Sequence, residues 1–218
     1  HPHLGEALGA QAKKLWHVSN VFRIPEAEKL ARRLAEASFA DRLFFANSGT
    51  EAIEASIKAV RGYQAAVGRA ERHRIIGMSD SFHGRTIAAV AASGNPSYVL
   101  NFAPTDHGFD HIAWGDMAAL DAAISDNTAG VIVETVQGEG GIRPLTGEML
   151  SHIRQVCDAE GLLLILDEVQ CGVGRSGKLF AYEAFGIEPD VLASAKGLGG
   201  GFPIGACLVS EKVGQHIV

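Results

Sequence analysis

The chain has 218 residues, of which 47% are hydrophobic, so it can bury a substantial core as one large domain or as one domain with an appendage. Charged residues make up 20%, and the formal net charge of −6 is the opposite of the basic balance typical of nucleic-acid binding. The longest apolar runs are far shorter than a membrane span, and the sequence shows no secretory signal peptide. We therefore expect neither a nucleic-acid partner nor a membrane partner.

The cysteines and histidines favour a reduced protein without a metal. The three cysteines form no CxxC pair and leave an odd thiol, which is typical of the cytoplasm, where we expect this protein to reside. They are Cys157, Cys171 and Cys207. The nine histidines are scattered without the spacing of metal ligands, so we expect no metal site.

The first half of the chain begins an alternation of helices and strands. A helix is predicted over 26–37, because Pro25 suits the start of a helix and apolar residues recur one turn apart. A short apolar strand, 43–46, leads into a second helix. The apolar side of that helix consists of Ile53, Ile57 and Val60.

The rest of the chain adds buried strands around one more long helix. The apolar runs predicted as strands in the rest of the chain are 74–78, 130–135, 162–167, 191–195 and 204–210. A helix is predicted over 148–160, with Met149, Ile153 and Val156 on one face and Gly161 as its stop signal. This alternation predicts the α/β fold class, with a mostly parallel sheet and helices on both faces.

The run LLLILDEVQCGVGRSGKL, 162–179, looks like two nucleotide signatures joined together. Its strand ends in Asp167 and Glu168, like a Walker B pair, and the glycines that follow come close to a P-loop. Leu179 stands where a P-loop needs a hydroxyl for Mg²⁺, which argues against ATP. The same glycines match a dinucleotide fingerprint, but Gly172 comes too late after the strand for the tight turn that NAD binding needs. A plain loop is favoured over either nucleotide site.

Lys196 ends another predicted strand, just before the glycine-rich run GLGGG. Asp167 ends an earlier strand, and one helix-sized crossover separates the two, so both can face the same edge of a parallel sheet. They match what pyridoxal 5'-phosphate (PLP) requires: an amine that forms an imine with the aldehyde, and a carboxylate that keeps the pyridine nitrogen protonated. The alternative is a buried salt bridge between Asp167 and Lys196.

Two further stretches complete a possible PLP site. Ser48, Gly49 and Thr50 lie between a strand and a helix, where free N–H groups and the helix dipole favour a phosphate. The alternative is an ordinary helix N-cap. In SFHGRT, 81–86, Phe82 offers an aromatic face and Arg85 a fork that binds carboxylates.

Together these stretches resemble the class-III aminotransferases, which use PLP and have the large domain of a fold-type-I PLP-dependent transferase. The resemblance runs along nearly the whole chain, in the order NSGTEA, FHGRT, ETVQGEGG, LDEVQCGVGRSGKLFAYE and AKGLGGGFPIGA. LWHVSNVFRIPEAEKLA, 15–31, is most similar to members that act on N-acetylornithine or N-succinylornithine.

The resemblance implies cofactor roles for the matching positions. Lys196 would carry the imine and move the proton between substrate and cofactor, and Asp167 would pair with the pyridine nitrogen. The other implied cofactor-binding residues are Ser48, Gly49 and Thr50 at the phosphate, Phe82 on one ring face, and Glu168, Val169 and Gln170 beside the ring.

The resemblance also implies how the substrate is held. Arg85 would bind its α-carboxylate, and Glu139 would line its distal end, with Glu134 supporting the same wall. Two positions depart from the family's pattern, because Thr135 stands where Pro is usual and Cys171 where Thr is usual. Cys171 is then either a reactive thiol or, as we expect, a buried one.

Family members have roughly twice as many residues, so we expect an N-terminal segment, 1–40, and a PLP-binding large domain, 41–218, without the C-terminal small domain. The resemblance implies a homodimer that moves the terminal amino group of N-acetylornithine or N-succinylornithine to 2-oxoglutarate, as in arginine biosynthesis. The alternatives are an ornithine or 4-aminobutyrate aminotransferase, or an inactive fragment of the cofactor domain.

Overall fold

The computed structural model describes residues 1–19, 21–100 and 107–217. Its strands are β1 Arg42–Ala46, β2 Arg74–Met78, β3 Phe109–Ile112, β4 Thr128–Glu134, β5 Val136–Gln137, β6 Arg143–Pro144, β7 Leu163–Asp167, β8 Val191–Ser194 and β9 Gly205–Val209. Its α-helices are α1 Pro2–Ala12, α2 Pro25–Glu36, α3 Gly49–Ala66, α4 Ile87–Ala92, α5 Pro96–Val99, α6 Met117–Ala123, α7 Gly147–Glu160 and α8 Glu211–Gly214. Two 3₁₀ turns are η1 Ala181–Ala184 and η2 Lys196–Gly199.

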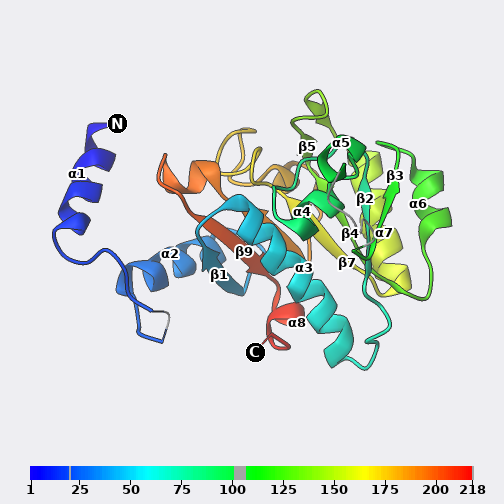
Figure 1. Cartoon of the computed structure of the whole chain (residues 1–218), viewed down its shortest axis with the longest axis horizontal. Helices are drawn as coiled ribbons and strands as arrows, with labels where there is room; N and C mark the ends of the chain where they lie inside the picture. Colours follow the sequence, from blue (N-terminus) through cyan, green and yellow to red (C-terminus); the bar gives the residue numbers. More distant parts are fainter. Residues whose placement is uncertain (20, 101–106, 218) are drawn as a thin grey trace.

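The main sheet of the described residues has the strand order β1-β9-β8-β7-β4-β2-β3. Strands β8, β7, β4, β2 and β3 run parallel to one another, whereas β9 is antiparallel to both of its neighbours. Figure 1 shows the sheet crossing the body of the molecule, with helices in front of it and behind it. The mostly parallel sheet predicted from the sequence is therefore confirmed.

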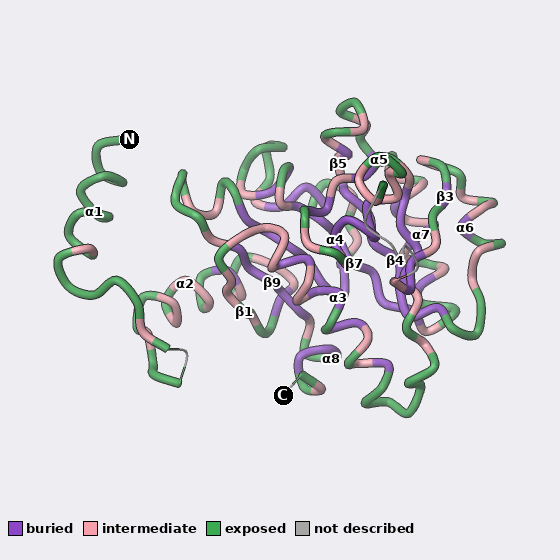
Figure 2. The backbone as a smooth tube through the Cα atoms, viewed as in Figure 1, coloured by how far each residue is buried: buried purple, intermediate pink, exposed green. Residues whose placement is uncertain are grey.

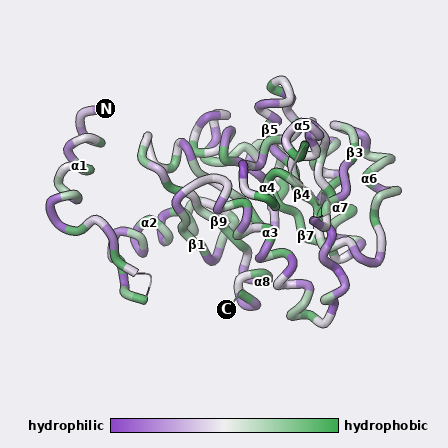
Figure 3. The backbone as a smooth tube through the Cα atoms, viewed as in Figure 1, coloured by the Kyte–Doolittle hydropathy of each residue, from purple (hydrophilic) through white to green (hydrophobic). Residues whose placement is uncertain are grey.

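Two separate cores cover the two faces of the sheet, because neighbouring strand residues point to opposite sides. Leu163 and Ile165 of β7 belong to the core shared with α3, α4 and α8. Leu164 and Leu166 belong to the core shared with α2, α6 and α7. Figure 2 shows the central strands buried throughout, and Figure 3 shows hydrophobic segments running through the same region. Helices on both faces are thus confirmed.

The six strands predicted from the sequence all form, with ends that shift by up to two residues. The helix predicted over 148–160 also forms as α7, and Gly161 ends it in a left-handed conformation with φ 66°. Its predicted buried face is wrong in detail, because Leu150, Ile153 and Cys157 are buried and Met149 and Val156 only half-buried. The i, i+3, i+7 stripe faces the sheet, and the predicted apolar positions border it.

The connection between β7 and β8 also differs from the prediction. It contains turns and the short η1, whereas a helix-sized crossover was expected. Residues 172–177 form a turn-rich loop in which Gly172 is buried and Gly174 and Gly177 are exposed. A dinucleotide fingerprint would require a long helix after these glycines, and none follows them. The loop interpretation of this run is confirmed.

The N-terminal helix α1 was not predicted, and Figure 1 shows it standing apart from the sheet. It has no buried residue. Among the helices of the described residues, none combines the length and the apolar character that crossing a membrane requires.

Candidate active site

A cavity of about 710 Å³ lies at the carboxyl ends of the parallel strands. Asp167 ends β7 and is paired in register with Glu134, which ends β4. Lys196 follows the neighbouring strand β8 and lines the same cavity. Ligands of open α/β sheets bind at this edge. The order of the strands therefore brings Glu134, Asp167 and Lys196 to one cavity.

The structure brings together ten of the residues predicted for the site. The lining includes Ser48, Gly49, Thr50, Phe82, Arg85, Glu139, Asp167, Val169, Gln170 and Lys196. It also includes Glu134, which was predicted only as a supporting residue, and His83 and Arg175, which sequence reasoning did not select.

Glu168 is the exception, because it is fully buried and does not line the cavity. Its carboxylate accepts hydrogen bonds from the main-chain N–H groups of Ala181 (2.6 Å) and Tyr182 (2.9 Å), and from the Thr135 hydroxyl (3.1 Å). Burial raises the pKa of Glu168 to about 7. We therefore correct its predicted role as a cofactor-binding residue. Consecutive side chains at the end of a strand point to opposite sides, so Asp167 faces the cavity and Glu168 points away from it and holds η1 in place. Thr135, which departs from the family's pattern, donates one of the hydrogen bonds that hold the Glu168 side chain.

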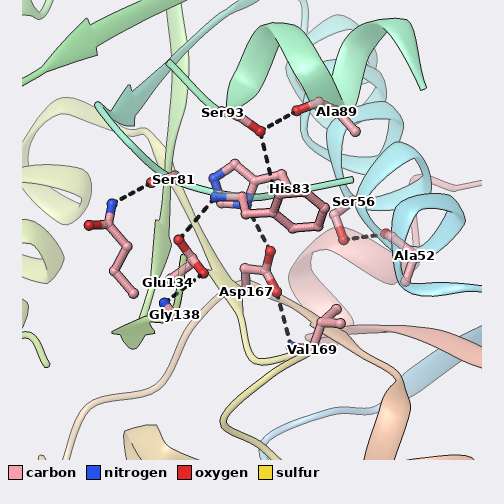
Figure 4. Close-up of polar contacts among 12 residues, drawn as sticks. Ala52, Ser56, Ser81, His83, Ala89, Ser93, Glu134, Gly138, Asp167 and Val169 are labelled. Atoms are coloured by element: carbon pink, nitrogen blue, oxygen red, sulfur yellow. Dashed lines mark hydrogen bonds and ion pairs between the residues drawn. The ribbon is translucent and has the colours of Figure 1, made fainter. Parts of the chain in front are cut away.

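Asp167, which lines the cavity, is held by two donors (Figure 4). His83 Nδ1 lies 2.7 Å from Asp167 Oδ2, and the main-chain N–H of Val169 donates to Oδ1 at 3.0 Å. Both side chains are almost completely buried, and His83 Nε2 has no partner among the described residues. This contact spans 84 positions. The only sequence signal was that His83 adjoins Phe82, so sequence reasoning missed it.

Glu134 is the second buried carboxylate of the cavity, beside Asp167. Its oxygens accept from the main-chain N–H groups of Phe82 (3.2 Å) and Gly138 (3.3 Å). Burial and the nearby Asp167 raise the pKa of Glu134 to about 7, against the opposing influence of His83 and these two donors. A carboxyl group with this pKa can hold or release a proton near neutral pH.

The start of α3 forms one wall of the cavity. Ser48 is its N-cap, and the Ser48 hydroxyl accepts from the Glu51 N–H at 3.3 Å, while Glu51 in turn accepts from the Asn47 N–H at 2.7 Å. The ordinary N-cap is thus present. The first N–H groups of a helix have no partner within it, so the same wall also offers donors to an anion.

Lys196 is exposed. Its Nζ donates a hydrogen bond to Gln170 Oε1. Its backbone has φ 41°, a left-handed conformation that is uncommon for residues with a side chain and is enriched at functional sites. Asp167 pairs with His83 and Lys196 with Gln170, so the alternative of an Asp167–Lys196 salt bridge is not realised.

Arg85 and Phe82 form an aromatic and cationic wall of the cavity. The guanidinium of Arg85 lies 4.4 Å from the ring centre of Tyr98 and 5.3 Å from that of Phe82. Neither ring neutralises its charge, and no carboxylate pairs with Arg85 among the described residues. The wall therefore suits a flat ligand that carries a carboxylate.

The cysteines lie outside this chemistry. All three are free and buried. Burial raises the pKa of Cys171 to about 12, so it is a thiol at neutral pH, as the expectation of a buried Cys171 requires. No group of His, Cys, Asp and Glu that could hold a metal occurs in the described ranges.

Comparison with known proteins identifies the family. The aminotransferase class-III family matches residues 1–218, and the chain belongs to it. An acetylornithine aminotransferase of Brucella melitensis is 57% identical over 99% of this chain and 53% of its own length. Acetylornithine aminotransferase 2 of Caulobacter vibrioides is 58% identical over 99% of this chain and 54% of its own length. The chain thus spans about half the length of the curated relatives it matches.

Solved structures confirm the fold of a PLP-dependent aminotransferase. The N-acetylornithine aminotransferase of Stenotrophomonas maltophilia matches 99% of this chain and 54% of its own, at 41% identity and a TM-score of 0.85. The ornithine aminotransferase of Toxoplasma gondii matches all of this chain and 53% of its own, at 32% identity and a TM-score of 0.93. A further structure of that Toxoplasma enzyme is described with partial occupancy of PLP at its active site.

Proposed function

We propose that this chain carries the cofactor site of a PLP-dependent transaminase that moves the terminal amino group of N-acetylornithine or N-succinylornithine to 2-oxoglutarate. The observation that carries the proposal is one cavity in which Lys196 and Asp167, from the ends of adjacent parallel strands, lie with the anion-binding start of α3. The names of the relatives support the acylornithine substrate over ornithine or 4-aminobutyrate.

The residues of the cavity fit PLP. The orphaned N–H groups at the start of α3 suit its phosphate, Phe82 and Val169 suit the two faces of its ring, and the buried Asp167 suits its pyridine nitrogen. Lys196, which is exposed to the cavity, can reach its aldehyde. When bound, PLP would supply an electron sink for the substrate's reacting carbon.

Each protein group then has a separate task. Lys196 would hold the cofactor and move a proton at the reacting carbon, and Gln170 orients its amine. His83 and the Val169 N–H keep the Asp167 carboxylate in one orientation. Arg85 would bind the α-carboxylate, and Glu139 would face the distal part of the substrate.

We also propose the division into an N-terminal segment, 1–40, and a large domain, 41–218. The sheet begins with β1 at Arg42, and of the residues before it that the structure describes, only Leu34 and Ala40 are buried. A homodimer and a cytoplasmic location complete the proposal. The three buried free thiols are compatible with a reducing compartment.

The test is covalent trapping of PLP. Incubation with PLP followed by borohydride should fix one adduct, and mass spectrometry should place it on Lys196. Lys196→Ala should abolish the adduct, whereas Lys178→Ala, at an exposed position directly after the 172–177 loop, should retain it. An adduct on another lysine, or none at all, would contradict the proposal. A coupled assay then compares N-acetylornithine, N-succinylornithine, ornithine and 4-aminobutyrate as amino donors with 2-oxoglutarate.

A further inference from the structure

Three polar side chains connect the start of α3 to the segment that carries Phe82 and Arg85. Thr50 is the second residue of α3, Glu54 lies one turn further along it, and Thr86 directly precedes α4. The Thr86 hydroxyl donates to the Glu54 carboxylate, and the hydroxyl oxygens of Thr50 and Thr86 lie 3.1 Å apart. We call these three residues the polar link.

The chemistry of the polar link fixes the direction of its hydrogen bonds. Thr86 donates its single hydroxyl proton to the Glu54 carboxylate. The Thr86 oxygen can then only accept from Thr50, whose proton is directed towards Thr86. The Thr86 N–H also points to the Thr50 oxygen, at 3.5 Å. Thr50 therefore offers an anion in the cavity its main-chain N–H, and its hydroxyl serves the polar link.

Close packing accompanies these hydrogen bonds. Gly84 has φ 129°, and a Cβ atom there would lie 2.2 Å from the Thr50 hydroxyl oxygen. The 82–86 segment thus lies directly against the Thr50 side chain. Glu54 and Thr86 themselves do not line the cavity.

We propose that Glu54 and Thr86 are positioning residues, which act through Thr50 to fix the distance between the anion-binding start of α3 and the wall formed by Phe82 and Arg85. This inference rests on the proposed function, because PLP has a phosphate for the first wall and a ring for the second. A ligand that touches both walls gains from their fixed spacing, whereas inorganic phosphate, which needs only the first, does not.

The experiment compares Thr86→Val with Thr86→Ser in this chain. Thr86 makes no helix-capping hydrogen bond, so valine removes the hydroxyl at nearly constant shape without removing a cap. Thr86→Val should weaken PLP binding, followed by absorbance, roughly three- to tenfold. Inorganic phosphate, measured by competition against PLP, should change less than about twofold. Thr86→Ser should retain wild-type affinity for both.

Glu54→Leu should reproduce the effect of Thr86→Val, and Lys58→Leu, an exposed position one turn further along α3, is its matched control. Equal losses for PLP and inorganic phosphate would overturn the proposal, because the hydroxyl chain would then form the anion site itself. Unchanged PLP affinity would overturn it as well.

A second readout needs no cofactor. Hydrogen exchange of the 82–86 segment should accelerate in Thr86→Val and stay unchanged in Thr86→Ser. Unchanged hydrogen exchange in Thr86→Val would contradict the polar link, whether or not the wild-type chain binds PLP. Failure of the wild-type chain to bind PLP would contradict only the proposed function.

Discussion

At the level of single residues, the charged side chains of the cavity differ in whether they have a partner. Asp167 has two donors, whereas Arg85 lies against two aromatic rings without a carboxylate partner in the described ranges. The donors of Asp167 hold its carboxylate in one orientation, whereas the guanidinium of Arg85 remains available to bind a ligand.

Arg85→Lys should weaken binding of a carboxylate substrate to the PLP-loaded chain about ten- to a hundredfold, because lysine loses the bidentate fork and the stacking on Tyr98. Titration with N-acetylornithine, followed through the cofactor absorbance, measures the change. PLP affinity should stay the same. Equal substrate affinity in Arg85→Lys would show that the carboxylate is held elsewhere.

Glu134 should make stability depend on pH. Its pKa is about 7 in the folded chain and near the ordinary 4.5 when unfolded, so the folded chain binds more protons between these values. Its contribution is therefore fully present below about pH 4.5 and is lost as the pH rises through 7. Inside this window, the free energy of unfolding should fall by up to about 1.4 kcal/mol per pH unit because of Glu134.

Glu134→Gln should flatten the decline of unfolding free energy between pH 5 and 7, measured by urea denaturation. Glu168, whose pKa is raised in the same way, keeps part of the slope. Glu139→Gln, at an exposed position of the same cavity, is the control that should leave the slope unchanged. A Glu134→Gln profile parallel to that of the wild type would refute the assignment.

At the level of elements, β9 allows α3 to reach the cavity. Gly205 opens β9 and pairs with Ala46 of β1, and a Cβ atom there would lie 2.1 Å from the Ser48 carbonyl oxygen. Any side chain would push β9 away from the junction between β1 and α3. The start of α3, and with it the anion-binding wall, therefore depends on this close approach.

The same substitution should have opposite effects at two glycines. Gly205→Ala should lower the free energy of unfolding by about 1–3 kcal/mol through overpacking and also weaken PLP binding. Gly62→Ala, within α3 and with no atom close to an added Cβ, should raise it by about 0.5–1 kcal/mol. Urea denaturation of both variants checks the pair. A neutral Gly205→Ala would show that β9 can shift freely.

Elements with strong apolar patterns were predictable from the sequence, whereas contacts between them were not. β7 follows from LLLIL alone, since a continuous apolar run suits a strand buried on both faces. The buried face of α7 was missed, because Met149 and Leu150 are both apolar and only the sheet decides which is covered. The His83–Asp167 contact depends on how the segment between β2 and α4 packs against the end of β7. The exposed helix α1 has no buried stripe that would reveal it.

For the molecule as a whole, apolar side chains gather on the N-terminal segment outside the sheet. Trp16 is 89% exposed, Val21 81% and Phe22 64%, and Leu4 and Leu8 of α1 are about half exposed. Figure 2 shows α1 and the stretch that follows it up to α2 almost entirely exposed, although Figure 3 shows some hydrophobic residues there. Soluble monomers rarely expose apolar side chains in such number along one segment, which favours association with another surface.

The chain should therefore self-associate in solution through this segment. The double variant Trp16→Ser, Phe22→Ser should shift the sedimentation distribution towards the monomer, because two large apolar side chains no longer gain from leaving water. Its melting temperature should stay near that of the wild type, since α1 buries none of its residues within the chain. Ile142→Ser is the matched control, because Ile142 is 78% exposed but lies on the loop between β5 and β6. Association that persists in the double variant and disappears in Ile142→Ser would place the contact surface beside the cavity. A large drop in the melting temperature of the double variant would show that the N-terminal segment packs on the rest of the chain.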